Sequence, residues 1–86
     1  MDVFEELLAL ADASLPSPLS ENEAVREEIA DLDAEGVAYD ALSVLFESGI
    51  TIPEDLLLRA LDEYSDSWTF VELANEALER QRAAAA

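Results

Sequence analysis

Apolar residues recur at intervals of three and four along most of the chain, which predicts amphipathic helices. In residues 3–13 they form one wide face, and Asp2 with Glu5 has the spacing of a helix-capping box. Pro16 and Pro18 then predict a turn, because proline lacks a backbone donor and restricts the residue before it. No stretch alternates apolar and polar positions as a half-buried strand does, so the pattern predicts an all-α protein.

A second helix is predicted over residues 21–35. Ser20 and Glu23 repeat the capping-box spacing at its start, and Gly36 is a natural residue for its C-terminal cap. The apolar positions of this segment form one narrow stripe, which consists of Val25, Ile29 and Leu32.

Three more helices follow. One is expected from Val37 to Glu47, closed by Gly49, and another begins at a third capping box, Thr51–Glu54, and ends near Ser65. Asp66 or Ser67 would cap the last helix. Their inward positions are predicted to be Ala38, Ala41, Leu42, Leu45, Phe46, Leu57, Ala60, Leu61, Tyr64, Trp68, Val71, Ala74 and Leu78. About five short helices make a compact bundle or an orthogonal array, and the pattern does not choose between them.

Length and composition indicate one folded domain, residues 1–86. The chain has 21 acidic residues and four basic ones, all arginine, and therefore a formal net charge of −17. Such a charge favours disorder only when hydrophobicity is also low, and here 51% of the residues are hydrophobic. A folded, very acidic helical domain is expected.

Composition also limits the catalytic and metal-binding side chains that the chain can offer. The chain contains no cysteine, histidine or lysine, so it lacks a thiol or imidazole for catalysis or metal binding and a lysine for a Schiff base. We expect no enzymatic activity, no cofactor and no metal. The apolar runs are too short to span a bilayer, and the N-terminus is acidic where an export signal is basic. Cytoplasmic residence is expected, in the host cell if the protein is encoded by a phage.

The strongest functional signal is an acidic cluster in residues 21–35. One arginine, Arg26, accompanies seven acids, which are Glu21, Glu23, Glu27, Glu28, Asp31, Asp33 and Glu35. Folding gains nothing from like charges four residues apart. A continuous helix of this length spans about 21 Å, so a net charge of −6 gives one charge per ~3.5 Å, close to the ~3.4 Å of a DNA strand. These seven residues are predicted to bind a partner as phosphate mimics.

The predicted partner is a basic protein, most naturally a nucleic-acid-binding effector. Direct contact with nucleic acid or an anionic membrane is disfavoured by the charge. We therefore predict a non-enzymatic inhibitor of the DNA-mimic type, such as a phage anti-CRISPR or anti-restriction protein. Alternatives are a toxin-neutralising immunity protein or antitoxin, and a structural or accessory subunit or homodimer that pairs through apolar faces of the first and fourth helices. Solubility or adaptation to high salt would also explain an acidic surface.

Two further motifs have simpler structural explanations. The segment Asp31–Gly36 matches the first half of an EF-hand calcium loop, but Leu42 stands at loop position twelve, where a glutamate is required. The segment Asp66–Leu73 resembles the acyl carrier protein family around its phosphopantetheine serine, which implies Ser67 as the attachment point; Trp68 replaces the leucine usual there. Helix ends and caps are the favoured explanation of both motifs.

The aromatic residues at the start of the last helix admit two interpretations. We expect Trp68 to pack on Tyr64 at the end of the preceding helix. The alternative is that Trp68 and Phe70 form an exposed anchor for a partner, since aromatic side chains dominate interface hot spots.

Overall fold

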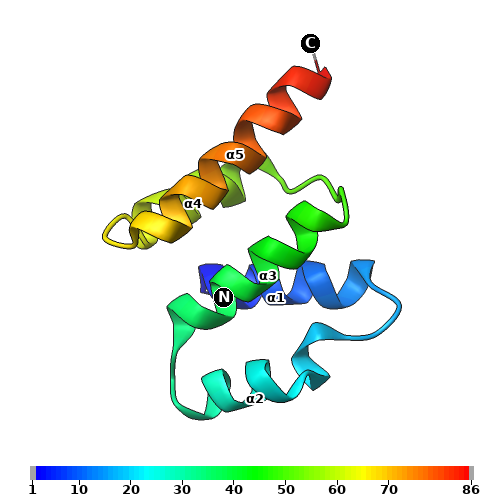
Figure 1. Cartoon of the computed structure of the whole chain (residues 1–86), viewed down its shortest axis with the longest axis vertical. Coiled ribbons are helices and arrows are strands. Elements are labelled where there is room, and N and C mark those ends of the chain that lie inside the picture. Colours follow the sequence, from blue (N-terminus) through cyan, green and yellow to red (C-terminus); the bar gives the residue numbers. More distant parts are fainter. Residues whose placement is uncertain (1, 86) are drawn as a thin grey trace.

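The computed structural model describes residues 2–85 and confirms the all-α class. Within that range the chain forms five α-helices, one short 3-10 helix and no strand (Figure 1). The elements are α1 (Val3–Ser14), η1 (Leu19–Glu21), α2 (Glu23–Ala30), α3 (Ala34–Glu47), α4 (Glu54–Glu63) and α5 (Trp68–Ala85).

Helix α3 is the central element. It packs against α1, α2 and α5, while α4 packs between α1 and α5. In Figure 1, α3, α4 and α5 run along a similar diagonal of the view, while α1 and α2 lie across that direction. The five helices therefore do not form a single antiparallel bundle. The radius of gyration is 12.2 Å, close to the value of about 12 Å expected for a compact chain of this length.

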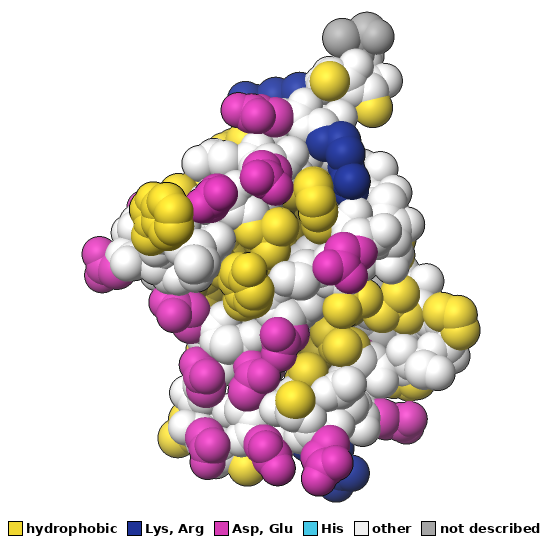
Figure 2. All heavy atoms as spheres, viewed as in Figure 1, with side chains coloured by type: hydrophobic (Ala, Val, Ile, Leu, Met, Phe, Trp, Pro, Cys, Tyr) yellow, Lys and Arg dark blue, Asp and Glu magenta, His cyan; other side chains and the backbone are white. Residues whose placement is uncertain are grey.

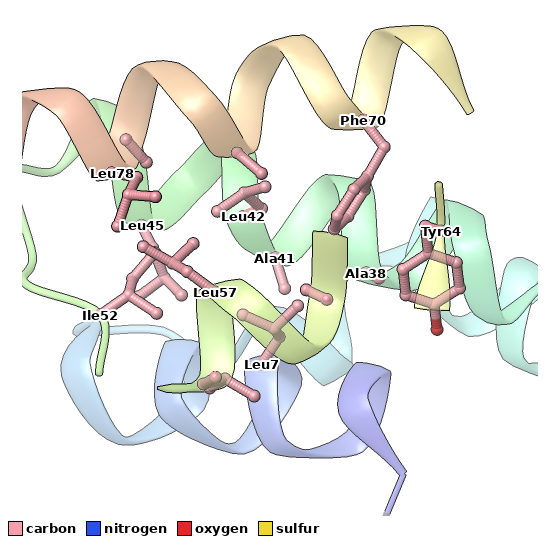
Figure 3. Packing of buried hydrophobic residues seen from close by; sticks show 14 of the residues in the cluster. Leu7, Ala38, Ala41, Leu42, Leu45, Ile52, Leu57, Tyr64, Phe70 and Leu78 are labelled. Carbon is pink, nitrogen blue, oxygen red and sulfur yellow. The ribbon is translucent and has the colours of Figure 1, made fainter. Parts of the chain in front are cut away.

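The core lies between α3 and the helices around it. Leu7 of α1, Leu42 and Leu45 of α3, Leu57 of α4 and Phe70 of α5 are fully buried and converge there (Figure 3). Four of the helices, α1, α3, α4 and α5, contribute their apolar stripes to this one cluster, while α2 buries only Val25, outside it. The polar faces of the helices are left on the surface.

Two predicted caps are confirmed. The backbone N–H of Asp2 donates to the Glu5 carboxylate at 3.1 Å, as the first capping box requires. At the start of α5 the Ser67 hydroxyl accepts from the Phe70 N–H at 3.4 Å. These contacts satisfy N–H groups that a helix N-terminus leaves without a partner.

The predicted boundaries of the second helix are wrong at both ends. Its N-cap is Asn22, whose side chain accepts from the Ala24 N–H at 3.0 Å, while Ser20 lies in η1. Its last residue is Ala30. Asp33 ends the connection to the next helix, because its side chain accepts from the Gly36 N–H at 3.0 Å and caps α3. Gly36 therefore lies inside α3 and does not terminate α2.

The third capping box is also wrong, because the N-cap of α4 is Pro53 and makes no side-chain cap bond. The segment before α4 is instead bound by a side chain of α5. The Gln81 side chain accepts from the Ile52 N–H at 2.7 Å and donates to the Ile52 carbonyl at 2.8 Å. This two-way clasp attaches the connection between α3 and α4 to α5.

Candidate partner-binding surface

The seven predicted site residues lie on η1, α2, the connection after it and the first turn of α3. Six of them are exposed: Glu21, Glu23, Glu27, Asp31, Asp33 and Glu35. We call these six the α2–α3 acidic surface. The seventh, Glu28, is half-buried.

The structure divides six of the seven acids between two hollows instead of arranging them along one helix, and Asp31 lines neither hollow. Glu21, Glu23 and Glu27 line a hollow together with Arg26. A second hollow of about 340 Å³ is lined by acids of α2, α3 and the connection between them, namely Glu28, Asp33, Glu35 and Asp40.

The predicted 21 Å helical ladder of charges is therefore wrong. Helix α2 ends at Ala30, so its eight residues span only about 12 Å. Of the acids spaced by four, Glu23 and Glu27 remain on α2, Asp31 is its C-cap residue and Glu35 belongs to α3. Figure 2 shows acidic side chains over α2 and the start of α3, and further acids over the rest of the visible face.

Three of the four arginines lie outside the α2–α3 acidic surface, in parts of the chain that carry twelve further acids. Arg59 pairs with Glu6 at 2.5 Å, and Arg82 Nε donates to Glu54 at 2.9 Å. Arg80 lies 3.8 Å above the Phe46 ring. The contacts of these three arginines join α4 to α1, α5 to α4, and α5 to the end of α3. Between residues 21 and 47 nine acids are accompanied by Arg26 alone, so the local field around α2 is strongly negative.

Glu28 and Asp40 form an acidic pair that the sequence did not reveal. Glu28 Oε2 is buried, and no N–H or hydroxyl donor of the described residues bonds to it. A hydrogen bond with Asp40, together with burial and the charges of Asp40 and Asp33, raises the pKa of Glu28 to about 7. Sequence gave no signal for this pair, because only the packing of α2 on α3 brings its members together.

Exposed apolar residues add a second component to this surface. Leu32, between Asp31 and Asp33, is 90% exposed and lies after the end of α2, although it was predicted to belong to the apolar stripe of the second helix. Trp68 is 77% exposed, so its predicted packing on Tyr64 is wrong. The Tyr64 ring instead lies 4.9 Å from the ring of Phe70, which is fully buried. Of the two aromatic anchors considered, only Trp68 is available to a partner.

The apolar faces of α1 and α4 are largely used by the core. Leu7 and Ala11 of α1 and Leu56, Leu57 and Ala60 of α4 are buried. The exposed large apolar residue on these two helices is Leu58, at 48%. Val3, Phe4, Leu8 and Leu10 of α1 are half-buried, so pairing through these helices stays a prediction.

The two discounted motifs are helix ends in the structure. Leu42, at the twelfth loop position, is fully buried, and Asp33 caps α3, while Ser67 caps α5. Among residues 2–85 no group of three potential ligand side chains is placed to hold a metal ion, and no helix is long and apolar enough to cross a membrane.

Comparison of the chain with family models, curated proteins and solved structures gives no match.

Proposed function

We propose that this protein is a non-enzymatic inhibitor that docks on a basic, nucleic-acid-binding surface of another protein, as phage anti-CRISPR and anti-restriction proteins do. The observation that carries the proposal is the local excess of exposed negative charge on α2, the connection after it and the start of α3. Six exposed carboxylates form the α2–α3 acidic surface, and Arg26 is the one basic residue among them. Such a partner implies action in the cytoplasm, that of the host if a phage encodes the protein.

The physical basis is competition for a cationic groove. A groove that binds DNA releases counterions when lysine and arginine meet phosphates, and carboxylates held at a surface can take the place of those phosphates. Complementary fields also speed the encounter of the two proteins, and salt weakens the attraction. The proposal therefore requires binding that depends on the α2–α3 acidic surface and falls steeply as salt rises.

A charge-reversal pair tests the proposal. In the first variant Glu21, Glu23 and Glu27, the exposed acids of one hollow, are changed to lysine. In the control Glu72, Glu76 and Glu79, which are exposed on α5, are changed to lysine, so both variants have the same net charge. Each is added to purified CRISPR effector nucleases and restriction enzymes while their DNA binding is followed by electrophoretic mobility shift.

The native chain and the α5 variant are expected to displace DNA from one of these enzymes, and the α2 variant is expected to lose that effect. Circular dichroism checks that both variants remain helical. Equal inhibition by the two variants would show that net charge alone is responsible and would reject the α2–α3 acidic surface as the site. If the affinity for the partner protein does not fall between low and molar salt, electrostatic docking is rejected.

A further inference from the structure

Leu32 occupies a backbone conformation that is unfavourable for its side chain. Its φ angle of 59° lies in the left-handed region, where glycine and, less often, asparagine or aspartate are usual. Its side chain is 90% exposed, so little burial offsets the strain. A strained, exposed leucine is therefore poorly explained by folding, and such positions concentrate at functional sites.

An apolar hollow lies beside this leucine. It has a volume of about 330 Å³ and is formed where the start of α1, the end of α2 and the start of α3 meet. Leu32 lines it together with Phe4, Ile29, Ala34 and Val37, and the acids Asp2 and Asp33 line it too. Ile29 is itself 41% exposed. The hollow is thus apolar, with carboxylates at its edge.

We propose that Leu32 and this hollow receive an apolar side chain from a basic segment of the partner protein. Asp2, Asp31 and Asp33 are complementary to lysine or arginine beside that side chain, while a second copy of this chain would bring another net charge of −17. The volume is at the lower limit for a small-molecule pocket and suits a single side chain. The inference rests on the proposed function, since it assumes a basic partner.

Two synthetic peptides separate the apolar contribution from charge. One is a basic amphipathic helix with leucine along one face, and the other has serine in place of every leucine, so both have the same charge. Burial of one leucine is worth about 1.5–3 kcal/mol, which corresponds to at least about tenfold in Kd. The leucine peptide is therefore expected to bind the native chain about tenfold more tightly by fluorescence anisotropy.

Leu32→Gly then tests the assignment of the site. Glycine tolerates the left-handed backbone, so the melting temperature is expected to stay unchanged or rise by a few degrees. Affinity for the leucine peptide should fall to that of the serine peptide, while affinity for the serine peptide stays the same. Leu58→Ala, which removes an exposed leucine from α4, should leave both affinities unchanged.

The outcomes distinguish this inference from the proposed function. Equal affinity of the native chain for both peptides, or a leucine preference that survives Leu32→Gly, overturns the inference and leaves electrostatic docking intact. A lowered melting temperature of Leu32→Gly also overturns it, because Leu32 would then contribute to folding. Failure of both peptides to bind at low salt counts against the proposed function, and the inference falls with it.

Discussion

Gly36 lies so close to Glu28 that a Cβ atom on the glycine would overlap the glutamate Oε2 atom. The absence of a side chain at position 36 gives the Glu28 carboxyl its place against the first turns of α3. There one of its oxygens is buried, and it shares a hollow with Asp33, Glu35 and Asp40. The carboxyls of Glu28 and Asp40 can hydrogen-bond to each other only when one of them carries a proton. The contact between α2 and α3 therefore depends on pH.

The first prediction concerns that dependence. The pKa of Glu28 is about 7 in the folded protein and has its ordinary value of 4.5 in the unfolded chain, so between these values the folded state retains a proton that the unfolded state has released. The contribution of protonated Glu28 to the free energy of unfolding is complete below about pH 4.5. It is lost as pH rises through about 7. The free energy of unfolding, measured by urea denaturation between pH 5 and 8, should therefore fall as pH rises.

Glu28→Gln is the matched variant for this prediction. A glutamine can donate to Asp40 at every pH, so the slope over this range should become flatter and stability at pH 8 should rise above that of the native chain. Glu27→Gln, which removes one exposed carboxylate from the same helix, should keep the native slope. A Glu28→Gln protein with the native slope would show that other groups cause the pH dependence.

The second prediction compares two aromatic residues at the start of α5. Phe70 is fully buried and contacts Tyr64, whereas Trp68 is 77% exposed. Phe70→Ala should lower the free energy of unfolding by about 3–5 kcal/mol through loss of burial and the cavity left behind. Trp68→Ala should change it by less than about 0.5 kcal/mol. Urea denaturation of both variants tests the contrast, and a larger loss for Trp68→Ala would contradict the burial of Phe70 and the exposure of Trp68.

Helical spacing and proline positions were sufficient to predict the all-α fold and most of its helices. Spacing alone did not settle which face of the last helix is buried. Trp68, Val71, Ala74 and Leu78 have helical spacing, but so do Phe70, Ala74, Ala77 and Leu78, and the second set is buried in the core. The two stripes share Ala74 and Leu78, so only the packing against α3 and α4 decides between them.

The end of the second helix was missed for a local reason. Gly36 and Asp33 are both signals of helix boundaries, one for an end and one for a start. The Asp33 side chain bonds the Gly36 N–H, so a new helix begins before the glycine and the predicted charge ladder is divided. The candidate acids were identifiable from composition, but the Glu28–Asp40 pair and the Leu32 conformation depend on this break and on tertiary packing.

The third prediction concerns the clasp between α5 and the segment before α4. Gln81→Ala leaves both backbone groups of Ile52 without the side-chain partner they have in the structure. Because Ile52 is almost fully buried, the free energy of unfolding should fall by about 1–3 kcal/mol. Hydrogen exchange at the Ile52 amide should also accelerate, whereas Asn75→Ala, at an exposed position of α5, should change neither quantity. Unchanged exchange at Ile52 would contradict the clasp.

The last prediction concerns electrostatic repulsion within the folded chain. With a net charge of −17, the native protein should show a higher melting temperature as salt screens its carboxylates. Glu27→Lys replaces a like-charge pair with Glu23, one turn earlier on α2, by an attractive pair, and places a cation toward the C-terminal end of that helix. It should raise the free energy of unfolding at low salt by about 0.3–1 kcal/mol and reduce the gain from added salt. Glu27→Gln, which removes the repulsion without adding attraction, should fall between the native chain and Glu27→Lys. A native melting temperature that is flat from low to molar salt would mean that the acidic surface imposes no significant repulsion on the folded chain.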